Sequence, residues 1–100
     1  MAQRTVVYWR DIPAQIIVKQ GRKTAKRQLS DRFQMAIDRA AMTAELGDTD
    51  DYLAHWRRGE PESCDDDLDA QADRAADEIE NAYSQKRLKA IVDAGGVEQG

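Results

Sequence analysis

Five cationic residues lie within nine positions of each other, with no acidic residue among them: Lys19, Arg22, Lys23, Lys26 and Arg27. Ammonium and guanidinium groups gathered on one short segment can bind phosphates. Gly21 favours the tip of a hairpin, and alternation along the returning strand points Lys26 and Arg27 to opposite faces. The sequence is net acidic, with a formal charge of −4, and carries no recognised nucleic-acid motif. We therefore favour a solvated hairpin, or one neutralised by residues 65–69, over binding of RNA or DNA.

A second group of candidate residues joins aromatic rings to charges at positions 8 to 11. An exposed Tyr8 or Trp9 beside the Arg10 cation could stack on a flat ring such as a base or a pterin. We favour packing instead, with Trp9 in the core and Tyr8 half-buried against a helix. Asp11 could orient a partner or a substrate amine, although an ion pair or a turn cap is the simpler role. Tyr8, Arg10 and Asp11 are retained as candidate binding residues.

The remaining polar residues do not form a catalytic or metal-binding pattern. The acidic run 65–69 fails the calcium-loop template, because Ala70 stands where the turn glycine belongs and Ala76 where the bidentate glutamate belongs. Acidic residues at a helix start explain this run better. His55 and Cys64 are each the sole residue of their kind, which is too few for a zinc site. We expect no catalytic residue, no metal and no cofactor, and a protein that is not an enzyme.

Three strands are expected to position these residues, at about 5–10, 14–19 and 24–29. The first is rich in β-branched and aromatic residues and is apolar on both faces, which favours a central or covered strand. Pro13 separates it from the second strand, since proline fixes φ and lacks an N–H group. The third is polar and rich in lysine and arginine, which favours an edge position.

Helices are expected at about 31–46, 50–58 and 65–94. Ser30 is a good N-cap for the first, and apolar residues then recur at three- and four-residue steps. A single helix over 65–94 would span roughly 45 Å, although a domain of this length has a radius of gyration of only about 13 Å. We leave one helix or two open and favour a break near 84–87. Residues 95–100 are expected to form a flexible tail.

Composition limits the class of protein. One hundred residues indicate a single domain, expected over 1–94, and no apolar run is long enough for a membrane span. The N-terminus lacks the features of a signal peptide, so we expect a cytoplasmic protein.

The two halves of the sequence differ in charge. Residues 1–47 carry nine Lys or Arg against four Asp or Glu, and residues 48–100 carry six against fifteen. Two halves of opposite charge are suited to packing against each other.

Three sequence stretches carry a resemblance to a known family: Tyr8-Trp9-Arg10-Asp11-Ile12-Pro13-Ala14-Gln15, Ala36-Ile37-Asp38-Arg39-Ala40-Ala41-Met42 and Tyr52-Leu53-Ala54-His55-Trp56-Arg57-Arg58-Gly59. From about Arg4 to Pro61 the chain resembles the small bacterial domain family labelled "virulence factor". That family also occurs as a module within larger conserved virulence factor proteins. The resemblance implies strands followed by helices and brings no catalytic residues. It also implies neighbours among folate- and corrinoid-dependent one-carbon enzymes in alphaproteobacteria.

Together these observations predict an α+β domain, with a small three-stranded antiparallel sheet packed against two or three helices. The leading functional hypothesis is a non-enzymatic interaction or accessory module that contacts a protein partner through the basic hairpin and the Arg10–Asp11 edge. Nucleic-acid binding through the hairpin is the first alternative. The second, which rests on the family resemblance, is an accessory subunit of a folate- or corrinoid-dependent one-carbon enzyme.

Overall fold

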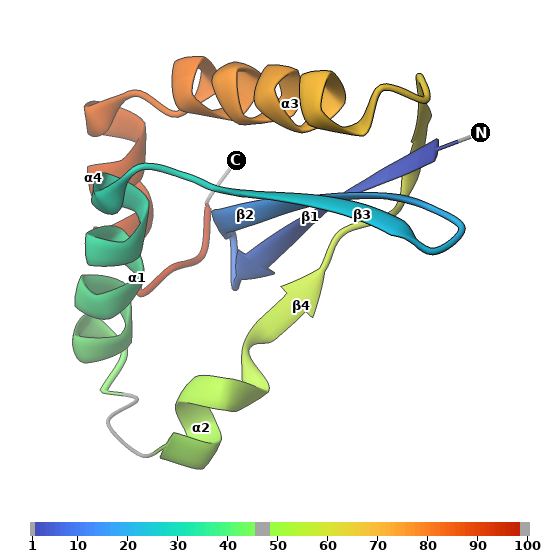
Figure 1. Ribbon diagram of the computed structural model, residues 1–100. Helices are drawn as coiled ribbons and strands as arrows, with labels where there is room; N and C mark the ends of the chain where they lie inside the picture. The colour runs from blue at the N-terminus through green and yellow to red at the C-terminus, as the bar shows by residue number, and fades with distance from the viewer. Residues whose placement is uncertain (1, 46–48, 99–100) are drawn as a thin grey trace.

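The computed structural model describes residues 2–45 and 49–98, which form an antiparallel sheet with helices on one face and at one end (Figure 1). The first half of the chain contributes β1 (Ala2–Trp9), β2 (Ile12–Gln20), β3 (Lys23–Gln28) and α1 (Asp31–Thr43). The second half contributes α2 (Thr49–Ala54), β4 (Trp56–Arg58), β5 (Glu62–Cys64), α3 (Leu68–Ala82) and α4 (Gln85–Asp93). The predicted α+β class and the antiparallel sheet are confirmed.

The sheet has five strands, so the prediction of three strands is wrong. Its order is β3-β2-β1-β4, and β5 also pairs with β1. β4 pairs with the end of β1 near Trp9, while β5 pairs with the beginning near Ala2. Both added strands have only three residues, which is too short to produce a periodic pattern. The predictions that β1 is central and that β3 is an edge strand are confirmed.

The second expected helix, 50–58, is partly wrong, because α2 ends at Ala54 and residues 56–58 form β4. If residues 56–58 were helical, the backbone N–H and C=O groups on the outer edge of β1 would lack partners near Trp9. Pairing with β1 satisfies them, through the register Val7 with Arg58 and Trp9 with Trp56. Tertiary pairing therefore outweighs the helical spacing of Tyr52 and Trp56.

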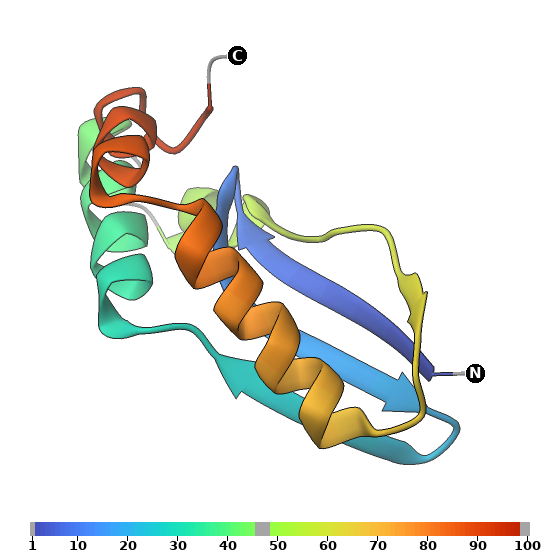
Figure 2. The ribbon, with the colours of Figure 1, turned by 90° about the horizontal axis from the view of Figure 1, so that it is seen from above.

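Helix α3 lies across one face of the sheet and covers the core (Figure 2). Ile16 and Val18 of β2 are fully buried beneath it. Ala72 and Ala75 of α3 are buried as well, in the contact between the helix and the sheet. Their neighbours along β2 alternate between the two faces, so Gln15 and Ile17 point away from α3. The two faces of the sheet therefore have different surroundings.

Helices α1 and α4 pack together at the end of the sheet (Figure 1). The chain breaks between α3 and α4 at Tyr83 and Ser84, and the Ser84 hydroxyl accepts a hydrogen bond from the N–H of Arg87. Of the two forms left open for 65–94, the structure has two helices. Burial of Leu88 and Ile91 against α1 explains the break, since these residues fall on a different face from Ile79 in a continuous helix.

Ion pairs connect the basic first half of the chain to the acidic second half. Arg4 pairs with Glu62 and Glu78, and Arg27 pairs with Asp69 and Asp73. A further pair joins Arg32 to Glu80, which also accepts hydrogen bonds from the N–H and hydroxyl of Ser30 at the start of α1. Burial opposes ionisation of Glu80, but these hydrogen bonds and the Arg32 charge lower its pKa overall. The opposite charges of the two halves are thus used partly to assemble the fold.

Candidate functional site

The turn between β1 and β2 holds Arg10 and Asp11 in contact with distant parts of the chain. Arg10 adopts a positive φ of 52°, and its guanidinium donates to the carbonyl of Gly95 at 2.8 Å. The same guanidinium lies 3.3 Å from Nε2 of His55. The backbone N–H of Arg10 donates to the carbonyl of His55. The Arg10 cation is therefore engaged within the molecule.

Asp11 joins the turn to the end of the described chain. Its carboxylate accepts a 2.7 Å hydrogen bond from the backbone N–H of Glu98 and a 3.2 Å hydrogen bond from Arg57. Its own N–H donates to the carbonyl of Gly96. Gly95 and Gly96 are buried, and residues 95–98 contact the domain through these bonds. Residues 99 and 100 lie outside the described part of the chain.

The two aromatic residues before this turn have separate environments. Trp9 is fully buried, donates from Nε1 to the carbonyl of Tyr52 and stacks on the Tyr52 ring at 5.7 Å between centroids. Tyr8 is half-buried, with the guanidinium of Arg57 4.5 Å from the centre of its ring. The predictions of a core Trp9 and a half-buried Tyr8 are confirmed. Trp9 therefore presents no face for stacking on a ligand.

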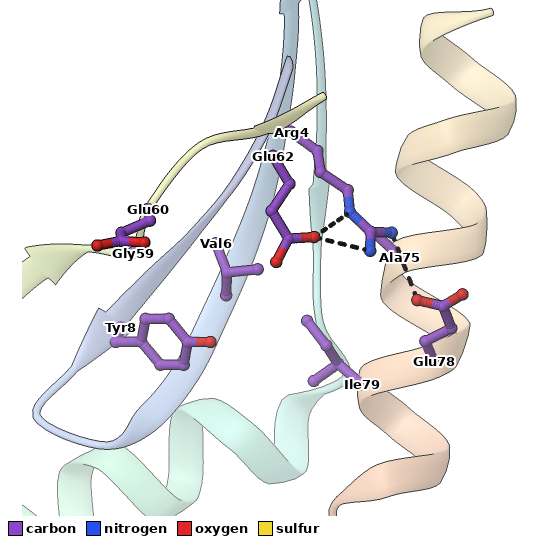
Figure 3. Close-up of a pocket in the computed structure, with 9 residues that line it drawn as sticks. All are labelled: Arg4, Val6, Tyr8, Gly59, Glu60, Glu62, Ala75, Glu78 and Ile79. Atoms are coloured by element: carbon purple, nitrogen blue, oxygen red, sulfur yellow. Dashed lines mark hydrogen bonds and ion pairs between the residues drawn. The ribbon is translucent and has the colours of Figure 1, made fainter. Parts of the chain in front are cut away.

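A small pocket of about 190 Å³ lies between β1, the segment from Gly59 to Glu62, and α3 (Figure 3). On one side, Glu62 and Glu78 hold the Arg4 guanidinium at 3.0 and 3.4 Å. Burial lowers the pKa of Arg4, but the two carboxylates more than offset this and raise it. Tyr8 and Glu60 line the opposite side. The polar groups in this pocket tie β1, β5 and α3 together, and they do not form a nucleophile with an adjacent base.

The hairpin cations fall into two sets. Arg27 faces α3 and pairs with Asp73 at 2.6 Å and with Asp69 at 3.2 Å. These hydrogen bonds raise the pKa of Arg27. The guanidinium therefore stays protonated, and the two carboxylates balance its positive charge. Within residues 2–45 and 49–98, no carboxylate forms an ion pair with Lys19, Arg22, Lys23 or Lys26. The structure therefore separates one structural cation from four that remain available.

Two of the available cations lie on the sheet face that points away from α3. Pairing of Lys19 with Thr24 and of Ile17 with Lys26 places these side chains on one face. We call this surface the open sheet face and define it by Thr5, Val7, Gln15, Ile17, Lys19, Lys26, Trp56 and Arg58. None of these eight residues is acidic. Val7 and Ile17 are half-buried and are not part of the buried core.

Sequence reasoning did not find Arg58 or assign Trp56 to a surface. Both depend on β4, whose residues carry no alternating pattern of their own. Trp56 is half-buried and borders a hollow of about 270 Å³ with Gln15 and Gln28. The only usable signal was the Arg57-Arg58-Gly59 run, in which two cations precede a glycine.

The residues considered for metal binding or nucleophilic catalysis are not brought together. His55 lies against Trp9 and Arg10, whereas Cys64 pairs with Ala2 at the opposite end of β1. The acidic run is divided among structural roles, since Asp66 accepts from the N–H of Ala2 and Asp67 caps α3. Among the described residues, no group of three or more His, Cys, Asp or Glu side chains could hold a metal ion. None of the described helices is long and apolar enough to cross a membrane.

Comparison with known proteins gives one match. A search of curated proteins finds no match to this chain, and a search of solved structures finds none either. A family model described as "Virulence factor" matches residues 7–92, which extends past Pro61, where the sequence resemblance ends, and includes the acidic segment, α3 and most of α4. Since this span covers most of the hundred residues, the chain belongs to the Virulence factor family.

Proposed function

We propose that this domain is a non-enzymatic interaction module that binds a protein partner through the open sheet face and the adjoining hairpin tip. One observation carries the proposal: the open sheet face has no acidic residue among the eight that define it, and it combines a half-buried aliphatic centre with cations that have no ion-pair partner among the described residues. Arg10 and Asp11 are held by the chain itself, so the proposed contact surface centres on Lys19, Lys26 and Arg58.

The composition of this face favours a protein over a nucleic acid. Single-stranded nucleic acids are bound by several exposed aromatic rings, on which successive bases stack. Here the centre of the face is aliphatic, with Val7 and Ile17, and Trp56 is the one aromatic residue among the eight that define it. An apolar centre with a polar and charged rim is the usual arrangement of protein interfaces. A partner surface with an apolar patch edged by carboxylates would match it.

A paired charge-reversal experiment tests this surface. Tagged wild type, K26E and R74E are used to capture proteins from the lysate of the native host, with and without nuclease. The two variants change the net charge equally, but Arg74 is exposed on α3, which packs on the opposite face of the sheet. We expect wild type and R74E to retain the same protein in the presence of nuclease, and K26E to recover much less of it. The one-carbon enzymes implied by the family resemblance are among the proteins that this capture can recover.

Three outcomes would contradict the proposal. Recovery that disappears on nuclease treatment would indicate nucleic-acid binding. Equal loss in K26E and R74E would indicate dependence on net charge alone. Equal recovery by all three proteins would mean that the sheet face is not the contact surface. Circular dichroism spectra and thermal midpoints of the variants serve as the folding control, and changes at the exposed Lys26 and Arg74 side chains should leave both nearly unchanged.

A further inference from the structure

Helices α1 and α4 form a groove of about 870 Å³ that is separate from the open sheet face. Ala36 and Leu88 are buried at its base, and Met35, Met42 and Val92 contribute further apolar surface. Its volume is several times that of the pocket beside Arg4, which measures about 190 Å³. Neither the predicted interaction surface nor the family resemblance assigns a role to this groove.

The methionines in this groove are unusually exposed for apolar side chains. Met35 is 52% exposed and Met42 is 78% exposed, and they are two of the four exposed large apolar residues in the described part of the chain. They lie seven positions apart on α1, so they occupy the same side of the helix. Exposed methionine is flexible and polarizable, and it adapts to the side chains of a bound partner. Exposed apolar patches on a protein surface are characteristic of interaction sites.

The rim of the groove carries an excess of positive charge. Arg39, Lys86 and Lys89 line it, and none of them forms an ion pair within the described residues. Among the described residues that line the groove, Asp93 is the one acidic residue. Arg32 also lines the groove, but its guanidinium is held by Glu80 and by the carbonyl of Tyr83. Three available cations therefore surround the apolar row.

We propose that this groove binds an acidic amphipathic helix of a partner protein. An apolar strip on that helix would cover Met35, Met42 and Val92, and glutamate or aspartate beside the strip would pair with Arg39, Lys86 and Lys89. The thirteen residues of α1 provide about 20 Å of length, which matches a helix of roughly 12–16 residues. A nucleic-acid backbone would neutralise the cations but leave both methionines exposed to water. The proposal involves a different surface from the open sheet face and does not depend on the proposed function.

A designed peptide panel tests the groove with the full chain. The probes are fluorescein-labelled 16-residue helices with leucine on one face and glutamate on the other, together with scrambled versions and versions with lysine in place of glutamate. We expect micromolar binding of the acidic amphipathic peptides, with chemical-shift changes at the methyl groups of Met35 and Met42. K86E/K89E should weaken binding at least tenfold, and K19E/K26E should leave it within twofold. M42K should also weaken it, without a folding defect, because Met42 is 78% exposed.

The alternative occupants have distinct signatures, and each of them would overturn the proposal. Equal binding of the scrambled peptides would show that charge alone is responsible. Absence of peptide binding at 1 mM, with binding to phosphatidylglycerol vesicles instead, would identify an anionic membrane surface. Methionine shifts that grow with protein concentration and no peptide present would identify a second copy of this chain. Loss of peptide binding in K19E/K26E but not in K86E/K89E would move the site to the sheet face.

Discussion

The two turns at the ends of β2 have similar local features but different surroundings. Each contains a residue with positive φ, Arg10 at 52° and Gly21 at 59°, and each is flanked by charged side chains. The Arg10–Asp11 turn is bonded to His55, to Arg57 and to the segment 95–98. A Cβ atom built on Gly21 would meet nothing within 4 Å. One turn is an assembly point for the fold, and the other projects into solvent.

This difference shows that charge in a turn does not by itself indicate function. Arg10 and Asp11 stabilise the domain by holding segments that are more than forty residues away in the sequence. Lys23 and Arg22 have no such contacts among the described residues, so their charges remain available to a partner. The largest effects on stability are therefore expected at the first turn and at the segment 95–98 that packs against it. At the second turn we expect effects on binding with little loss of stability.

The largest predicted effect is that of G96A. Gly96 has a φ of +97°, and an added Cβ would lie 2.8 Å from the ring of Trp9. Backbone strain and the clash with a fully buried ring should lower the free energy of unfolding by about 2–4 kcal/mol. Urea denaturation monitored by tryptophan fluorescence measures this change.

G21A is the matched control for G96A. Its positive φ of 59° costs about 1 kcal/mol for a residue with a Cβ, but no atom obstructs the added methyl group. If G21A destabilised the domain as much as G96A, the contrast between the buried and the projecting turn would be wrong.

D11A should have the second-largest effect. The substitution leaves the N–H of Glu98 and the guanidinium of Arg57 without their shared carboxylate, and the expected loss is about 1–3 kcal/mol. Thermal unfolding by circular dichroism measures it, and hydrogen exchange should show faster exchange at the amide of Glu98. An unchanged thermal midpoint would mean that the turn does not hold the end of the described chain.

The ion pair between Arg87 and Glu98 should give a smaller, pH-dependent effect. The hydrogen bond from Arg87 lowers the pKa of Glu98 below its ordinary value of 4.5. A lowered folded-state pKa contributes stability that is present above pH 4.5 and is lost as pH falls through the folded value. Since both side chains are partly exposed, E98Q should cost only about 0.5–1 kcal/mol at pH 7.

Thermal midpoints between pH 7 and pH 3 test the role of Glu98. The difference between wild type and E98Q should shrink as the pH falls below 4.5. A constant difference across this range would show that the carboxylate charge is not what stabilises the contact.

K23Q should have the smallest effect on stability, within about 0.5 kcal/mol, because the side chain is exposed and makes no ion pair among the described residues. Its thermal midpoint should match that of wild type. A loss of 1 kcal/mol or more would show that the hairpin tip is structural, as the first turn is.

The strongest local patterns predicted the corresponding elements well. β-Branched residues before Pro13, Gly21 between two polar runs, and the apolar spacing from Phe33 to Ala40 each led to an observed strand, turn or helix. Burial of Trp9 also followed from its position in an apolar strand. The i and i+7 spacing of Met35 and Met42 was visible too, but an exposed and a buried apolar row look the same in a sequence.

The sequence alone therefore determined the α+β class, the central and edge positions of the first three strands, and the charge asymmetry of the two halves. The tertiary structure alone decided that residues 56–58 and 62–64 add to the sheet, because their pairing with β1 is a long-range contact without a local pattern. It also decided which charges hold the fold together and which remain available. Arg10 and Lys23 are both cations beside a turn, and only the segments packed around each of them distinguish their roles.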